Sequence, residues 1–111
     1  MNVVQGDIIW VVFPFTDLSS SKLRPALVLS NSEVNKTGDI ICMQVTSNLR
    51  NDNFSYSLKT ENFKGSPLLK PGELRLHKIF VIHRSLIKSV ITSVNTDTLV
   101  DIKLHLNKKV L

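Results

Sequence analysis

Two apolar runs separated by one short polar loop place the strongest constraint on how this chain can fold. Residues 8–13 read "IIWVVF" and end at Pro14, and residues 25–31 read "PALVLSN". The loop over residues 15–22 holds an aspartate and three consecutive serines, which are typical turn residues. A run that is apolar at every position is typical of a strand buried on both faces or placed at a subunit contact. We therefore predict two strands joined by a turn, with Pro25 at the first position of the second strand, where a missing N–H is tolerated.

Four more stretches show strand periodicity. Residues 39–48, "DIICMQVTSN", alternate so that Met43 and Val45 lie on one face of a strand and Thr46 lies on the other. Residues 72–82, "GELRLHKIFVI", predict a strand in two parts. The two other predicted strands are residues 54–58 and residues 88–94, and polar loops are predicted around residues 35–38, 48–53 and 59–72.

The C-terminal segment changes to a helical period. Asn95 or Thr96 can cap a helix, and Asp97 suits its positive end. The apolar positions that follow have helical spacing; they are Leu99, Ile102, Leu106 and Val110. Strands followed by one helix predict a mainly β (α+β) domain over residues 1–111, in which the helix packs on a mostly antiparallel sheet or small barrel.

Charge and composition narrow the classes of function. Fourteen Lys and Arg against nine Asp and Glu give a net charge of +5 and a pI near 9.6, which favours a polyanionic or acidic partner. No apolar run approaches the ~20 residues that cross a bilayer, and the N-terminus lacks the pattern of a signal peptide. The single cysteine, Cys42, suits a reducing compartment and is read as a buried small hydrophobe rather than a nucleophile. We expect a cytoplasmic protein.

Several kinds of site are excluded by spacing. The three histidines and Cys42 have no zinc-ligand spacing, the four glycines are isolated, and there is no nucleophile-elbow motif. We therefore expect neither a metal nor a cofactor.

Polar side chains at strand ends are the remaining candidates for chemistry. Arg24 begins the second predicted strand, and Thr46 and Ser47 end the third. Arg75 and His77 are two positions apart in the fifth predicted strand and share one of its faces. Arginine pairs phosphate oxygens through a planar fork, threonine can hydrogen-bond the same group, and histidine can transfer protons near neutral pH. Successive residues on one face stand roughly 7 Å apart, about the span of a phosphodiester. Each side chain also has an ordinary reading as a solvated or strand-capping group.

These residues also carry a resemblance to a known family. "GDIIWVVFPFTDLSSSKLRPALVLSN" followed by "MQVTSN" resembles the N-terminal half of the PemK/MazF-like toxins of type II toxin–antitoxin systems. The Gly-Asp opening, the "RP" and the "TS" match in type and spacing. "GELRLHKIFVIHRSLI" is similar to the family's Arg-x-Asp strand followed by a short helical segment, and "NTDTLVDIKLHL" stands where the family has its C-terminal helix.

The resemblance implies a fold, a reaction and partners. It implies a small SH3-like antiparallel barrel (CcdB/MazF-like) with a C-terminal amphipathic helix, assembled as a homodimer. It implies a metal-independent endoribonuclease that cleaves single-stranded RNA, such as mRNA, by attack of the 2′-hydroxyl on the phosphodiester. The expected products end in 5′-hydroxyl and 2′,3′-cyclic phosphate groups. The expected partner is a small acidic antitoxin protein, whose complex with the toxin binds DNA.

The resemblance also implies roles for individual residues. Arg24 matches the arginine at the phosphate, Thr46 the threonine that holds it, and Arg75 an arginine used by the plasmid-borne branch, so these residues are the catalytic candidates together with His77. His77 stands where related members have aspartate, and the loop over residues 16–22 lacks the Glu/Gln-plus-Gly segment of better-known members. The candidates for binding RNA are Ser47, Asp17, Lys22 and Arg50.

Three alternatives remain open on the sequence alone. A member of the same fold could act by protein binding, either as a gyrase-targeting toxin or as a catalytically inactive protein, and His77 keeps the second possibility open. An RNA-binding barrel unrelated to toxins is disfavoured by the few aromatic residues, because Trp10 and Phe13 fall in the buried first strand. The apolar run over residues 8–13 is also a candidate dimer contact.

Overall fold

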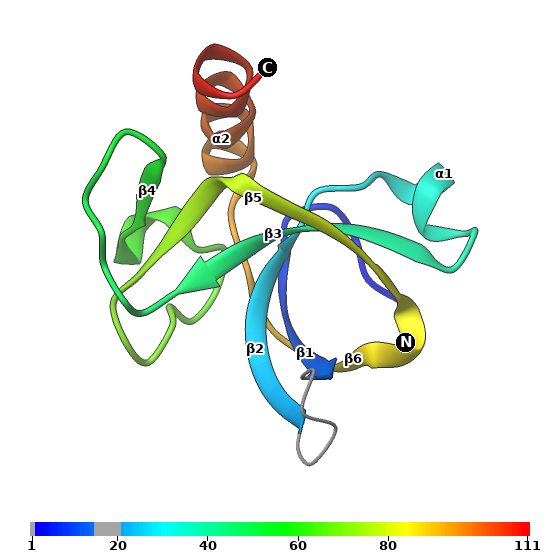
Figure 1. Ribbon diagram of the computed structural model, residues 1–111. Helices are drawn as coiled ribbons and strands as arrows, with labels where there is room; N and C mark the ends of the chain where they lie inside the picture. The colour runs from blue at the N-terminus through cyan, green and yellow to red at the C-terminus, as the bar shows by residue number, and fades with distance from the viewer. Residues whose placement is uncertain (1, 15–20) are drawn as a thin grey trace.

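The computed structural model describes residues 2–14 and 21–111, which form one antiparallel sheet, two α-helices and two short 3-10 turns (Figure 1). The strand order is β4-β5-β3-β2-β1-β6. The strands are β1 (Asp7–Pro14), β2 (Ser21–Val28), β3 (Asp39–Thr46), β4 (Ser55–Leu58), β5 (Gly72–His83) and β6 (Ile87–Ser93). The helices are α1 (Ser32–Asn35) and α2 (Thr96–Lys109), and the 3-10 turns are η1 (Thr60–Asn62) and η2 (Arg84–Leu86).

This architecture confirms the predicted fold class, with the sheet open rather than closed. β4 and β6 lie at opposite edges of the strand order. The β3–β5 register shifts between Met43 and Val45, and the β1–β6 register shifts twice, so the sheet bends at these points. β5 runs unbroken from Gly72 to His83, whereas the sequence predicted a strand in two parts. α1 replaces part of the loop expected near residues 35–38.

The first half of β1 contributes buried side chains to both faces of the sheet, as one of the two interpretations of the apolar run predicted. Ile8 belongs to an apolar cluster on one face, together with Leu27 of β2, whereas Ile9 and Val11 belong to a second cluster on the other face. All four side chains are fully buried within the chain. Burial within the chain thus covers three of the six residues of the apolar run, whereas Val12 and Phe13 are half-buried and Trp10 is exposed.

β2 begins earlier than predicted, which changes the setting of Arg24 and Pro25. Both residues lie inside the strand, paired with Val11 and Trp10 of β1, rather than at its start. β3 pairs only with residues 26–28 of β2, so Pro25 lies beyond that paired segment and its missing N–H costs no ladder bond there. The segment around Arg24 is therefore held by β1 on one side.

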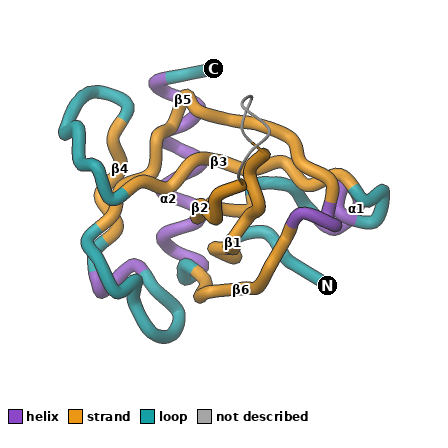
Figure 2. The backbone as a smooth tube through the Cα atoms, turned by 60° about the horizontal axis from the view of Figure 1, so that its bottom comes forward, coloured by secondary structure: helices purple, strands orange, loops and turns teal. Residues whose placement is uncertain are grey.

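The C-terminal helix packs on the sheet through the predicted apolar stripe. Asn95 caps α2 by accepting a hydrogen bond from the Thr98 backbone N–H at 2.8 Å. Ile102 is fully buried, and Leu99 and Leu106 pack beside it against the cluster that contains Ile8. Figure 2 shows α2 running behind the strands, along one face of the sheet. Within the described ranges, no helix is long and apolar enough to cross a membrane.

Cys42 gives a first testable consequence of this packing. Its side chain is fully buried on β3, and burial raises the pKa of the thiol to about 12. We expect the thiol to resist alkylation by iodoacetamide at pH 8 in the native protein and to react at the rate of a free cysteine once urea unfolds the chain. Mass spectrometry of timed samples measures this, and rapid labelling without urea would contradict the described packing.

Candidate active site

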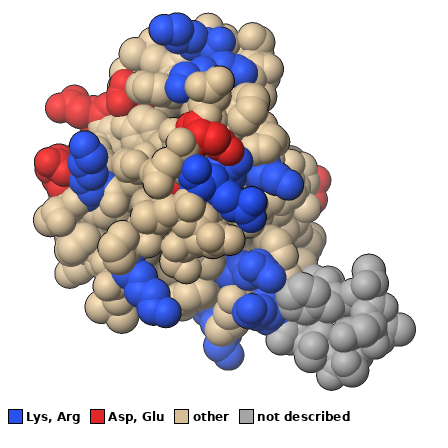
Figure 3. Space-filling model, turned by 60° about the vertical axis from the view of Figure 1, so that its left-hand side comes forward, with Lys and Arg blue, Asp and Glu red and all other residues tan. Residues whose placement is uncertain are grey.

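A cavity of about 440 Å³ opens where β1, β2 and the end of β3 meet the loop before β5. Three cations and no carboxylate stand among the described residues that line it. We call this cavity the groove; its lining is Trp10, Lys22, Leu23, Arg24, Pro25, Val45, Thr46, Ser47, Leu68, Leu69, Lys70, Pro71, Gly72 and Ile91. Lysines and arginines are also spread over the face of the molecule in Figure 3. The lining suits a ligand that is anionic on one side and apolar on the other.

Four of the predicted site residues come together in this groove. Lys22 and Arg24 reach it from β2, and Thr46 and Ser47 reach it from the end of β3. Arg24 is half-buried, whereas Lys22 and Ser47 are exposed. Antiparallel pairing thus brings together two segments that lie about twenty residues apart in the sequence.

Thr46 is fixed in a way that leaves its hydroxyl proton available. Its Oγ1 accepts a hydrogen bond from the Asn48 backbone N–H at 3.0 Å. A hydroxyl has one O–H donor and two acceptor lone pairs, so this bond uses a lone pair and not the proton. Gly72 stands on the opposite wall, where a Cβ would come within 3.4 Å of both the Thr46 carbonyl oxygen and Leu68 Cδ1. A Cβ at this position would therefore meet both neighbours in ordinary van der Waals contact.

The structure does not bring Arg75 to the groove. Its guanidinium donates to both carboxylate oxygens of Asp52, at 2.9 and 3.0 Å, and to Glu73 Oε2 at 3.0 Å. Glu73 is fully buried and also accepts from the backbone N–H groups of Arg50 and Asn51 and from the Ser55 hydroxyl at 2.6 Å. Arg75 therefore holds the β3–β4 loop to β5 through Asp52, and Glu73 holds it through two backbone N–H groups.

The other predicted site residues lie elsewhere. His77 is exposed on β5, and its ring centroid lies 4.5 Å from that of Phe54. Arg50 is exposed in the β3–β4 loop and does not line the groove. Asp17 and the neighbouring loop lie outside the described residues.

A family comparison decides what kind of protein has this groove. Residues 4–110 match the model of a family described as PemK-like, MazF-like toxin of type II toxin–antitoxin system. The chain belongs to this family. A sequence search of curated proteins finds no match.

Solved structures support the fold of this PemK/MazF-like toxin. A MazE–MazF complex from Deinococcus radiodurans aligns with a TM-score of 0.76 at 20% identity, covering 96% of this chain and 93% of that one. An endoribonuclease bound to its cognate antitoxin, from a mycobacterial species, gives 0.74 at 17% identity, covering 97% and 94%. An endoribonuclease from a mycobacterial species gives 0.74 at 20%, covering 98% and 92%. These likenesses confirm the fold of the toxin.

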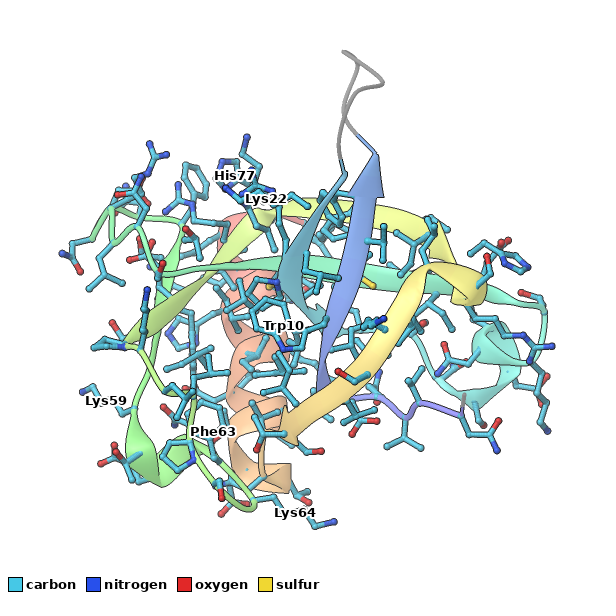
Figure 4. The ribbon with its side chains drawn as sticks, turned by 90° about the horizontal axis from the view of Figure 1, so that it is seen from below. Trp10, Lys22, Lys59, Phe63, Lys64 and His77 are labelled. Atoms are coloured by element: carbon cyan, nitrogen blue, oxygen red, sulfur yellow. The ribbon has the colours of Figure 1, made fainter. Side chains whose placement is uncertain are left out.

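Two parts of the toxin's groove were missed from the sequence. Trp10 was assigned to a buried strand, but its side chain is 37% exposed and lines the groove (Figure 4). Residues 68–71, read only as loop, form a second wall in which Leu69 is fully exposed. An unusually exposed leucine and tryptophan could be found only once the strands were placed in space.

Within residues 2–14 and 21–111 of the toxin, no three His, Cys, Asp or Glu side chains are grouped so that they could hold a metal ion.

The carboxylates of the Arg75 network give the toxin a predictable response to acid. Hydrogen bonds from Arg75 and Phe54 hold the pKa of Asp52 well below its usual range, and hydrogen bonds from Ser55 and Arg75 overcome the effect of burial and lower the pKa of Glu73. Because both pKa values are lower in the folded state, the unfolded chain binds more protons in acid, and stability falls as pH falls.

We therefore expect the free energy of unfolding to decrease steadily from about pH 5 downward, the region where unfolded carboxyl groups begin to take up protons. Urea titrations at pH 7, 4 and 2.5 measure this decrease. A Glu73→Gln variant should show a shallower decrease, because it lacks one of the two carboxylates whose pKa is lowered by the Arg75 network. Equal slopes in the two proteins would contradict a role for Glu73 in acid stability.

Proposed function

We propose that this toxin is a metal-independent endoribonuclease that cleaves single-stranded RNA in the groove. The observation that carries the proposal is that Arg24 and Thr46 line one cavity with two lysines and no described carboxylate. Such a lining attracts a phosphodiester. The affinity for RNA should fall as the salt concentration rises, because binding releases counterions from the RNA. Family membership and the fold shared with endoribonucleases support the same reaction.

The proposed reaction uses the RNA's own nucleophile. The 2′-hydroxyl loses its proton and attacks the adjacent phosphorus, the P–O5′ bond breaks, and the 5′-oxygen takes up a proton. The products are a 2′,3′-cyclic phosphate and a 5′-hydroxyl. Arg24 is assigned to the charge that develops on the phosphorane oxygens, and Thr46 is assigned to hold a phosphate oxygen through its O–H. No general base is assigned, since the described lining contains neither a carboxylate nor an imidazole.

We propose a small acidic antitoxin as the partner that controls this activity. Two similar structures are complexes of a toxin with an antitoxin. The net charge of +5 favours an acidic segment, and a disordered acidic tail could fold over the same groove and exclude RNA. We further propose that the toxin acts as a homodimer in the cytoplasm, where mRNA is its substrate.

A cleavage assay tests the proposal. The purified toxin is incubated with a long single-stranded RNA in the presence of EDTA, beside a fully duplexed RNA of the same sequence. We expect discrete cuts in the single strand and none in the duplex. No cutting of several RNAs by correctly folded protein would overturn the nuclease proposal and favour a toxin that acts by binding a protein.

His77 provides a separate prediction. Because it packs against Phe54 outside the groove lining, we expect His77→Ala to lower the cleavage rate by less than about tenfold, whereas loss of a general acid or base typically costs about 10²–10⁴-fold. Single-turnover rates between pH 5 and 8 measure this. A larger decrease in the cleavage rate, together with loss of the acid limb of the pH profile, would show that His77 transfers a proton in the reaction.

A further inference from the structure

We propose that Trp10 is the platform on which a nucleobase of the bound RNA stacks, next to the phosphate held by Arg24 and Thr46. The proposal rests on the proposed function, because it names the residue that would hold a base of that substrate.

Trp10 is exposed although its strand lies inside the sheet. It stands on an inner strand of the sheet, with Pro25 of β2 opposite it on one side and Ser89 of β6 opposite it on the other. Its neighbours Ile9 and Val11 are fully buried, yet the indole is 37% exposed. An indole anchored on both sides by strands and still open to a cavity is a rigid flat surface that lacks a partner over part of its area.

The groove that Trp10 lines has a polar part and an apolar part. One part of the lining is polar and cationic, with Lys22, Arg24, Thr46 and Ser47, and suits a phosphate. The other part is apolar, with Trp10, Pro25, Leu68 and Ile91 among its members, and suits a group with no charge. A nucleotide has both characters, because its phosphate is anionic and its base is a flat aromatic ring.

The backbone pairing beside Trp10 is irregular. The β1–β6 register shifts between Ile8 and Ile9 and again between Trp10 and Val11, so irregularities flank Trp10 on that side. Such irregularities re-aim side chains and are common beside functional sites.

Figure 4 shows Trp10 near the middle of the molecule, between Lys22 on one side of the view and Phe63 and Lys64 on the other.

The sequence makes the test unusually clean, because Trp10 is the only tryptophan. The probe is an unlabelled single-stranded oligonucleotide carrying 2′-O-methyl groups, which cannot be cleaved by 2′-hydroxyl attack. Its counterpart is an abasic sugar-phosphate oligomer of equal length. Tryptophan emission reports contact with the indole, and competition against a fluorescein-labelled oligonucleotide, followed by anisotropy, reports binding independently.

We expect the base-containing oligonucleotide to quench Trp10 emission and the abasic oligomer to leave it unchanged. Trp10→Ala should weaken binding of the base-containing probe by roughly 5- to 150-fold, the range of one base–aromatic stack, and leave binding of the abasic oligomer unchanged. Trp10→Phe keeps an aromatic face and should recover part of the loss. Val90→Ala is the matched control, because Val90 is an equally exposed apolar side chain on β6 outside the groove, and it should bind like the wild type.

Two outcomes would overturn the proposal, and they are distinguishable. Binding of the 2′-O-methyl probe by anisotropy with unchanged Trp10 emission and no effect of Trp10→Ala would remove Trp10 as the platform and leave the proposed nuclease intact. Binding of neither probe would overturn both the platform and the proposed function. The wild-type quenching experiment needs no variant, so it decides the matter even if Trp10→Ala fails to fold.

Discussion

Replacing Arg24 by alanine is expected to lower the rate of RNA cleavage by about 10²–10³-fold, the loss typical of removing one group that stabilises charge in a transition state. The expectation follows from the position of Arg24 in a groove that also contains Thr46 and has no described carboxylate. RNA binding should weaken far less than the rate, because Lys22 and Lys70 remain to attract the phosphates. Single-turnover cleavage and equilibrium binding on the same RNA separate the two effects.

Arg84 offers a matched control for this substitution. It is an exposed arginine on η2 that lines a different cavity, with Lys36 and Asn35. Arg84→Ala removes the same charge from the protein, so it should change the cleavage rate only slightly. Arg24→Lys should lie between alanine and the wild type, because lysine keeps the charge and loses the planar fork. Equal rates for Arg24→Ala and Arg84→Ala would remove Arg24 from the reaction.

Replacing Glu73 by alanine is expected to destabilise the fold by about 3–5 kcal/mol, the usual cost of removing one partner of a buried ion pair. Glu73 is fully buried, and its loss takes hydrogen-bond partners from Arg75, from Ser55 and from the backbone of the β3–β4 loop. That loop begins directly after Thr46, with Ser47 as its first residue, so cleavage should fall as well. Urea denaturation at pH 7 measures the stability.

Glu61 is the control for Glu73. It lies exposed on η1, and Glu61→Ala should change the free energy of unfolding by no more than about 0.5 kcal/mol, as surface substitutions usually do. Arg75→Ala should resemble Glu73→Ala in stability, because both break the same network. A stable Arg75→Ala protein that binds RNA normally and fails to cleave it would instead support the catalytic role that the family resemblance implies.

The strands could be predicted because their patterns are local. The apolar run at residues 8–13 indicated burial on both faces, and the helical spacing around Ile102 indicated a helix packed on the sheet. The sequence places the start of β2 too late, because a proline usually marks the first position of a strand or an edge. The structure shows that a proline fits inside this strand where β3 no longer pairs with it.

The site could be predicted only in part, because it depends on which way side chains point after the strands pair. Arg24 and Thr46 share the groove because antiparallel pairing brings their strands together. The spacing of Arg75 and His77 indicated a strand, and both residues lie on β5. No local pattern reveals that Asp52 and Glu73 bind the guanidinium of Arg75. The exposure of Trp10 likewise depends on the neighbouring strands and on the loop before β5.

A single 2′-deoxy substitution tests whether the groove cleaves RNA by attack of its 2′-hydroxyl. The wild-type cut is first mapped in a defined RNA, and the same RNA is then made with deoxyribose at the nucleotide on the 5′ side of that cut. We expect the all-ribose strand to give 2′,3′-cyclic phosphate and 5′-hydroxyl ends, and the substituted strand to be bound with similar affinity and left intact at that position. Cleavage of the substituted strand at the same position and rate would show that the 2′-hydroxyl is not the nucleophile.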